Sequence, residues 1–386
     1  MYNFDEEIDR KNTSCLKHDV MSAYFGDYKD LQPLWVADMD LRTPDFITQA
    51  MSEKIQHGIF GYTRPTQTLK DAVVAWMKDR HNYTIKEEYL TFVNGVVPAY
   101  SAAIEAFSKE GDEIIVQTPA YYPFFNHVKS NNRVLVCNPL KENDGYYTMD
   151  LEDFENKITA KTKILVLCSP HNPVGRVWKK EELSALAKIC IKHNIKIISD
   201  EIHADLVFEK FTSLASISEE IADITLTLNS AGKTFNIAGL NCGYAICKNV
   251  EMKKSFDEVV TKREVNAINL FGFVAHEAAY TKGHIWLEEL KNYLQSNIDF
   301  TYDFLKSNNS KIEFVKPEAT YLLWLNFRKL NNTHSQIKHR LLGDAKVALN
   351  DGTTFGKEAK GYFRINIALP KAKLKIALQK IVTNLH

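Results

Sequence analysis

The chain has 386 residues, of which 45% are hydrophobic and 25% are charged, the composition of an ordinary globular protein with room for two or three domains. Its 48 basic residues balance 48 acidic ones, so the net charge of +0 gives no reason to expect a nucleic acid or an anionic membrane as a partner. No apolar run reaches the roughly 18 residues of a membrane span, no signal peptide is visible, and the six cysteines form no C-x-x-C pair, so we expect a cytoplasmic protein with reduced thiols.

An α/β pattern extends over residues 51–285, after a first segment with weak periodicity. Short runs rich in β-branched residues alternate there with stretches of helical spacing, such as Lys180–His193. Strands that alternate with helices predict a mostly parallel sheet with helices on both faces. The predicted strands are Glu113–Gln117, Val134–Cys137, Lys163–Cys168, Ile195–Asp200, Ile224–Asn229 and Gly243–Cys247.

The pattern changes near residue 286. A long amphipathic helix is predicted over His284–Ser307, followed by strand-like runs at Thr320–Phe327 and Tyr362–Ala368 and by a closing helix. We therefore predict an α/β protein with two domains. The large α/β domain takes residues 51–285, and a smaller α+β domain combines residues 1–50 with residues 286–386.

Polar clusters follow several predicted strands, and ligands of open α/β sheets bind just beyond the carboxyl ends of the strands. The cluster Asn94–Tyr100 leads into a predicted helix at Ala99–Phe107, and backbone N–H groups at a helix start bind phosphate well. The cluster Ser169–Gly175 holds two prolines and a glycine, which fix a tight turn. Its Asn172 can donate an amide hydrogen bond to a cofactor oxygen, although a plain turn would show the same pattern.

Two further clusters supply a carboxylate and an amine. An apolar strand ends at Asp200, which either caps the next helix or pairs with the pyridine nitrogen of pyridoxal 5′-phosphate (PLP), whose protonated ring is the better electron sink. Lys233 lies among small and aromatic residues in Ser230–Asn236, which makes it a candidate Schiff-base amine. A solvated surface lysine is the alternative for Lys233 taken alone.

Two partial motifs are rejected. Gly232-Lys233-Thr234 resembles the end of a P-loop, but the required earlier glycine is replaced by Thr227. His276-Glu277 begins a zinc-protease pattern, but Tyr280 stands where the second histidine belongs, so no metal site is predicted.

Taken together and in this order, the clusters resemble the aspartate aminotransferase superfamily of PLP enzymes, known as fold type I. The N-P-x-G turn, the D-E-I-H strand end and the S-x-x-K-T-F-N lysine loop carry the likeness, which extends over nearly the whole chain. Several segments are similar to the cystathionine β-lyase-type C–S lyases, the MalY/PatB group. These are Phe4–Arg10, Leu34–Asp40, Gly61–Thr63, Asp200–Asp205, Lys233–Leu240 and Phe363–Ala368.

The resemblance implies a role for each matching residue. Lys233 would form the Schiff base with PLP and move the α-proton, Asp200 would pair with the pyridinium nitrogen, and Asn172 would bond the phenolate oxygen. Arg364 would hold the substrate α-carboxylate by a bidentate pair, a task that suits arginine better than lysine. The remaining implied contacts are ring stacking by Tyr121, phosphate binding by the backbone of Val96 and Val97 and by Ser230, substrate contact by Tyr122, and a phosphate contact from Tyr62 of a neighbouring subunit.

The contact from Tyr62 implies a homodimer.

Three departures from the superfamily pattern bear on the site. Asn241 replaces an arginine that binds phosphate in many aminotransferases, as is common among the lyases. His203 replaces a tyrosine that contacts the phenolate oxygen, so we predict only that His203 lines the site. His18 stands where the lyases usually carry an aromatic residue.

The leading hypothesis is a PLP-dependent C–S β-lyase that cleaves cystathionine, cysteine or related S-substituted cysteines to pyruvate, ammonia and a thiol. An aminotransferase that acts on amino acids is the alternative within the same cofactor class, because both reactions begin with loss of the α-proton. A third hypothesis is a binding or regulatory protein that retains the fold without catalysis.

Overall fold

The computed structural model describes residues 2–385. A seven-stranded sheet forms its centre, with strands in the order β2 (Leu90–Val93), β10 (Gly243–Cys247), β9 (Thr225–Asn229), β8 (Lys196–Asp200), β7 (Thr162–Cys168), β3 (Glu113–Thr118) and β4 (Val134–Pro139). Only β10 runs antiparallel to its neighbours. The predicted α/β class with a mostly parallel sheet is therefore confirmed, and all six predicted strands are present.

Helices cover both faces of this sheet because its strands are apolar on both sides. In β7, Ile164 and Val166 pack with one face, towards helices α5 (Val96–Phe107), α6 (Pro123–Ser130) and α11 (Val250–Lys262). The alternate residues Leu165 and Leu167 pack in a separate cluster with α7 (Leu151–Asn156), α8 (Lys180–Lys192) and α9 (Glu219–Asp223). This alternation is the two-residue period of a strand whose two faces are both buried.

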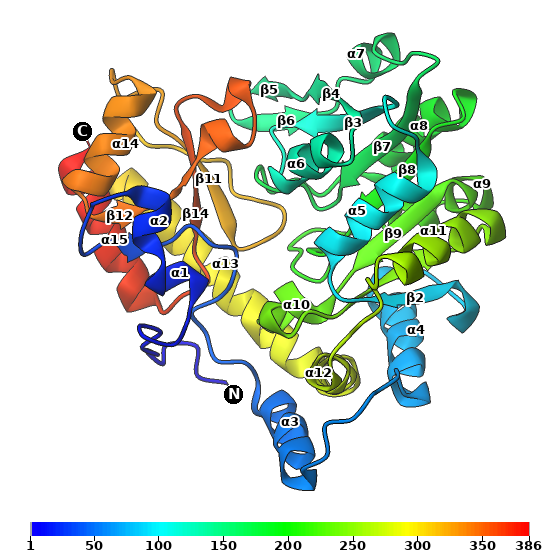
Figure 1. The fold of residues 1–386 in the computed structure, drawn as a ribbon. Coiled ribbons are helices and arrows are strands. Elements are labelled where there is room, and N and C mark those ends of the chain that lie inside the picture. The colour runs from blue at the N-terminus through cyan, green and yellow to red at the C-terminus, as the bar shows by residue number, and fades with distance from the viewer. Residues whose placement is uncertain (1, 386) are drawn as a thin grey trace.

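A second, three-stranded sheet lies apart from the first and has the order β11 (Leu322–Asn326), β14 (Tyr362–Asn366) and β13 (Asn350–Asp351). The long helix α13 (His284–Ser307) has the predicted bounds and connects the two regions, as Figure 1 shows. Buried residues of α13 and of the closing helix α15 (Lys371–Asn384) share one core with β11 and β14.

The N-terminal segment joins this second region. Strand β1 (Gln32–Pro33) pairs in parallel with β12 (Val347–Ala348). The short helix α1 (Leu16–Asp19) is followed by α2 (Met21–Phe25), whose Met21 and Phe25 pack with the apolar cluster that contains Leu342 of α14 (His334–Gly343). The predicted small domain also includes Met1 and His386, which lie outside the described residues. The other helices and strands are α3 (Asp45–His57), α4 (Gln67–His81), α10 (Ala231–Thr234), α12 (Leu270–Lys282), β5 (Lys141–Asn143) and β6 (Tyr146–Thr148).

Within residues 2–385, no helix is both long enough and apolar enough to span a lipid bilayer.

Candidate active site

A cavity of about 310 Å³ opens where the large sheet faces β14. Strands β7 and β8 end at its wall with Cys168 and Asp200, while Ser230 directly follows β9. Because parallel strands deliver their carboxyl ends to the same edge of a sheet, side chains that are distant in the sequence meet here. All of the predicted site residues except Tyr62 line this cavity: Val96, Val97, Tyr121, Tyr122, Asn172, Asp200, His203, Ser230, Lys233 and Arg364.

Lys233 lies on the short helix α10, and its amine reaches into the cavity. The Nζ atom donates a hydrogen bond of 2.6 Å to the carbonyl oxygen of Ala37. Burial lowers the pKa of Lys233 to about 8, although the nearby Asp38 carboxylate favours the charged amine. About a tenth of this lysine is therefore unprotonated at pH 7, far more than for an ordinary lysine, and the unprotonated amine is the form that acts as a nucleophile or a base.

Asp200 is the last residue of β8 and is buried. Its Oδ1 accepts a hydrogen bond of 3.1 Å from the N–H of Ile202. Burial nevertheless raises the pKa of Asp200 to about 6, more than this hydrogen bond and the charge of Lys233 lower it, and no described residue forms a salt bridge with the carboxylate. A positively charged ring nitrogen placed against Asp200 would supply the missing partner.

Asn172 and Arg364 are hydrogen-bonded to each other, although Asn172 lies in the turn after β7 and Arg364 lies in β14 of the other sheet. Arg364 Nη1 donates to Asn172 Oδ1 at 2.9 Å. The oxygen of the amide is therefore engaged, and the amide N–H groups of Asn172 are left to donate to an acceptor in the cavity.

Arg364 is buried without an anion. Its Nη2 atom donates to the carbonyl oxygen of Trp35 at 3.0 Å and to Asn350 Oδ1 at 2.6 Å, and the guanidinium lies over the ring of Phe355 at 4.9 Å. Nε has no partner within residues 2–385. Burial lowers the pKa of Arg364 to about 10. A buried arginine held only by neutral groups is a strong receptor for a carboxylate, which would remove the cost of the uncompensated charge.

The start of α5 forms the opposite wall. Gly95 adopts a φ of +139° and turns the chain into the helix, so the N–H groups of Val96 and Val97 are in its first turn, where an α-helix offers no internal acceptor. These N–H groups suit an anion such as phosphate. The Oδ1 atom of Asn94, beside them, is buried and has no partner among the described residues.

Ser230 also lines this end of the cavity, but its hydroxyl has protein partners. It donates to the carbonyl oxygen of Cys242 at 2.7 Å and accepts from the N–H of Gly232 at 2.9 Å. The ring of His276 lies 3.2 Å from the same oxygen. His276 is thus a buried neighbour of the site. The sequence had assigned it no role, because the zinc motif that contains it was rejected.

Aromatic residues cover the cavity from α6 and the turn before it. Tyr121 and Tyr122 have ring centroids 5.3 Å apart, and burial raises the pKa of Tyr121 to about 12, so this ring stays neutral. Burial also lowers the pKa of His203 to about 3, and its Nδ1 has no partner within residues 2–385. Asn241, the replacement for the usual arginine, lines the cavity near Ser230.

Tyr62 is separate from this group. It lies in an irregular segment and is fully exposed, and no contact joins it to the cavity of the same chain. His18 does not line the cavity either; its Nε2 lies 3.4 Å from Asp40.

Comparison with known proteins matches these features to one family. The model for aminotransferase class I and II proteins aligns with residues 30–381. The chain belongs to this family.

Relatives of this aminotransferase-family chain match it over almost its full length. It is 41% identical to cystathionine beta-lyase PatB of Bacillus subtilis, over 98% of both chains, and 31% identical to Protein MalY of Escherichia coli, over 97% of this chain and 96% of that one. The crystal structure of cystalysin from Treponema denticola, which contains PLP, superposes with a TM-score of 0.96 at 35% identity over 100% and 98% of the two chains. The predicted membership of the aminotransferase superfamily, with its likeness to the MalY/PatB group, is thus confirmed.

Some residues of the site in this aminotransferase-family chain were not predicted from the sequence. Asn350 bonds Arg364 from β13, and the carbonyl oxygens of Trp35 and Ala37 bond Arg364 and Lys233. A backbone carbonyl leaves no mark on the sequence, and Asn350 lies in a short strand without a recognisable pattern.

The groups in the cavity fit PLP. The amine of Lys233 suits its aldehyde, the unpaired carboxyl of Asp200 suits its ring nitrogen, and the N–H groups of Val96 and Val97 suit its phosphate.

Proposed function

We propose that this protein is a PLP-dependent C–S β-lyase that cleaves cystathionine, cysteine or related S-substituted cysteines to pyruvate, ammonia and a thiol. The observation that carries the proposal is a single cavity in which a buried amine of lowered pKa, a buried carboxyl group without a salt bridge and a buried arginine without an anion face one another. The lyases PatB and cystalysin among the relatives support this reaction over others of the family.

PLP, when bound, supplies an aldehyde and a pyridine ring that withdraws electrons from the α-carbon of an amino acid. Asp200 holds the ring nitrogen in its protonated form, because a cation there relieves the burial of its own carboxylate. Lys233 would hold the cofactor through its amine and, when free, would accept the α-proton at Nζ. Its lowered pKa lets it accept and release a proton near neutral pH.

Arg364 binds the α-carboxylate of the substrate. Its hydrogen bond to Asn172 links this carboxylate-binding group to the cofactor side of the cavity. With its amide oxygen occupied by Arg364, Asn172 would donate an N–H to the phenolate oxygen of PLP. Tyr122 contacts the substrate from the aromatic wall.

The remaining predicted residues hold the cofactor. Tyr121 would stack on its ring, and the N–H groups of Val96 and Val97 with the Ser230 hydroxyl would hold its phosphate. His203 stays neutral at physiological pH and lines the site.

We further propose a homodimer in which Tyr62 of each subunit completes the site of its partner. The support is that Tyr62 is fully exposed and has exposed apolar residues beside it, Ile59 and Phe60. A cytoplasmic location fits the six cysteines, all of which are free thiols and four of which are buried.

The activity is tested with purified protein, PLP and a panel of cystathionine, cysteine, cystine and alanine. We expect pyruvate from all three sulfur amino acids, together with a thiol from cystathionine, sulfide from cysteine and a persulfide from cystine, and none of these from alanine, which has no leaving group on its β-carbon. Lys233→Ala is the matched control, because it removes the amine while keeping the rest of the cavity, and its pyruvate production should fall to background. Absence of pyruvate from every S-substituted cysteine would contradict the lyase.

An aminotransferase would give a different result in the same panel. It would convert the amino acid to a keto acid that keeps its sulfur substituent and would leave the cofactor as pyridoxamine phosphate. The family model named for aminotransferases makes this the outcome to examine if pyruvate is absent.

A further inference from the structure

The segment Trp35–Asp40 belongs to no helix or strand, and its first three residues line the cavity that contains Lys233 and Arg364. Irregular backbone has no ladder or helical bonds of its own, so its polar groups must find other partners. Each of the five consecutive carbonyl oxygens from Trp35 to Met39 accepts a hydrogen bond from at least one side chain, and the N–H of Asp40 donates to the carbonyl oxygen of Ala368.

Two of these carbonyls bind the residues that carry charge in the site. The carbonyl oxygen of Trp35 accepts from Arg364, and that of Ala37 accepts from both Lys233 and the hydroxyl of Tyr321. The position of this backbone therefore helps to determine where the Lys233 amine and the Arg364 guanidinium lie.

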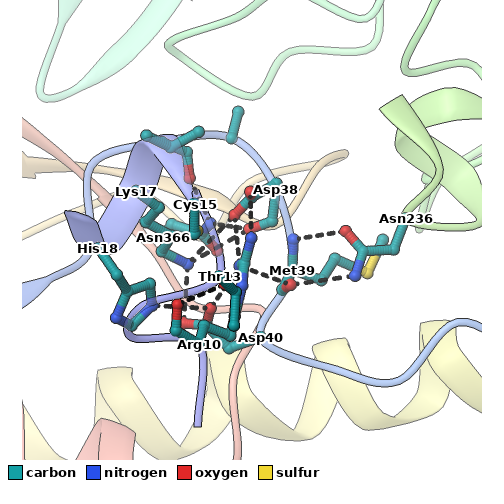
Figure 2. Close-up of polar contacts among 12 residues, drawn as sticks. Arg10, Thr13, Cys15, Lys17, His18, Asp38, Met39, Asp40, Asn236 and Asn366 are labelled. Atoms are coloured by element: carbon teal, nitrogen blue, oxygen red, sulfur yellow. Dashed lines mark hydrogen bonds and ion pairs between the residues drawn. The ribbon is translucent and has the colours of Figure 1, made fainter. Parts of the chain in front are cut away.

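The other carbonyls anchor the segment. Asn366 donates to the carbonyl oxygens of Val36 and Asp38, and the amide of Asn236 bonds both the N–H and the carbonyl oxygen of Met39. Figure 2 shows these two asparagines approaching the segment from different sides.

A compact ionic cluster fixes the end of the segment (Figure 2). Arg10 binds both oxygens of Asp38 at 3.0 and 2.8 Å and Asp40 at 2.7 Å. The fully buried Lys17 pairs with Asp40 at 2.8 Å and lies 3.5 Å from Asp38. Burial opposes ionisation of Asp40, but Lys17, His18 and Arg10 hold its pKa well below the usual range.

The cluster suits positioning better than ligand binding. Its two carboxylates are matched by the two cations Arg10 and Lys17, which leaves no unpaired charge to recognise a substrate. We infer that Asp38 is a positioning residue for Lys233: held by Arg10, it places the Ala37 carbonyl and provides the counter-charge to the Lys233 nitrogen. This inference rests on the proposed function, since it concerns the nitrogen that joins the cofactor.

The charged and titratable groups around Lys233 act on the protonation of its nitrogen in opposite directions. Asp38 and Asp200 favour the protonated nitrogen, Arg364 opposes it, and His203 faces it as a neutral ring. Removing the charge of Asp38 therefore favours loss of the proton, whereas removing Arg10 leaves Asp38 without its strongest cation and favours retention of the proton.

The test is a pH titration of visible absorbance on the cofactor-loaded protein, because the colour of PLP bound to lysine depends on protonation of the nitrogen. Relative to wild type, Asp38→Asn should move the titration midpoint to lower pH and Arg10→Met should move it to higher pH. Asp38→Glu should restore the midpoint towards the wild-type value. The matched control is Arg42→Met, which breaks the exposed pair with Glu6 just after the segment and should leave the midpoint unchanged.

A steady-state readout separates this role from general loosening of the fold. Asp38→Asn should lower kcat with little change in KM, because it acts on the proton-carrying nitrogen. Asn350→Ala, which removes a support of Arg364, should mainly raise KM.

The outcomes are distinguishable. Midpoints that stay at the wild-type value in both variants, or move in the same direction, would overturn the role of Asp38 while leaving the proposed function intact. A wild-type protein that takes up no PLP and shows no visible band would overturn the proposed function, and this inference with it.

Discussion

Asp200 is buried at the end of a strand, and this burial raises its pKa to about 6 in the protein without cofactor. The folded protein therefore keeps a proton on this group between about pH 4 and pH 6, where the unfolded chain has lost it. Stability falls as the pH rises through this window, because the folded state binds more protons than the unfolded state.

We therefore expect Asp200→Asn to stabilise the cofactor-free protein, by on the order of 2 kcal/mol at pH 7.5 and by less at pH 4.5. The same variant should lose turnover, since a neutral amide does not hold the ring nitrogen protonated. Thermal unfolding of both proteins at the two pH values measures the difference. The exposed Asp27→Asn is the control and should change neither. An equal gain at both pH values would argue against ionisation as the cause.

At the residue scale, the sequence indicated that Lys233, Asp200 and Asn172 lie near one another, because each lies at or shortly after the end of a strand and the ends of parallel strands meet; their roles stay predictions. Arg364 required the family resemblance, since it lies within β14 of the other sheet. The acceptors at Trp35 and Ala37 could not be predicted, because they are backbone atoms whose position depends on side chains far away in the sequence.

At the scale of elements, the turn after β7 positions Asn172. Gly175 closes this turn with a φ of +73°, and its N–H donates to the carbonyl oxygen of His171 at 2.8 Å. A Cβ at this position would lie 2.5 Å from Cβ of Pro317, in the segment that precedes β11. The turn is thus confined both by its backbone conformation and by a neighbouring segment.

Gly175→Ala should lower the stability of the protein by about 2–3 kcal/mol and reduce kcat/KM, because relief of the contact shifts the turn that carries Asn172. Gly111→Ala is the matched control, since Gly111 has a φ of +80° but open space around it. We expect the control to lose only about 1 kcal/mol and no activity. Chemical denaturation and steady-state kinetics measure both effects, and equal losses in the two variants would refute the steric argument.

Elements with a strong periodic pattern were predicted with near-exact bounds, as α13 shows. Helix α14 was not predicted. It begins inside a polar stretch of the sequence, and a helix with a polar cap at Thr333 and three buried residues has only a weak apolar pattern. The antiparallel direction of β10 was also not predicted, since strand direction depends on the path of the connection rather than on the residues of the strand.

At the scale of the whole molecule, Tyr62 lies outside the cavity of its own chain. The proposed homodimer predicts complementation between two inactive variants. Lys233→Ala and Tyr62→Ala, unfolded and refolded together, should regain about one quarter of the wild-type sites, because half of the dimers are mixed and each mixed dimer contains one intact site. If pyruvate production does not recover, Tyr62 does not complete the site of the partner subunit. Each variant refolded alone is the control.

The division into domains at about residues 50 and 286 stays a prediction. The structure does show why the first segment of the chain cannot be assigned by periodicity: β1 is two residues long, and the segment after it is held by side chains of Arg364, Asn366 and Asn236.

The cavity is closed by Trp35–Asp40 from the early part of the chain and by Arg364 and Asn366 from the late part. A ribosome must therefore finish nearly the whole polypeptide before the amine and the guanidinium can take their places. Chains that end before residue 364 would contain Lys233 and Asp200 but lack Arg364, so they could not form the contact with an α-carboxylate that we propose for the full site.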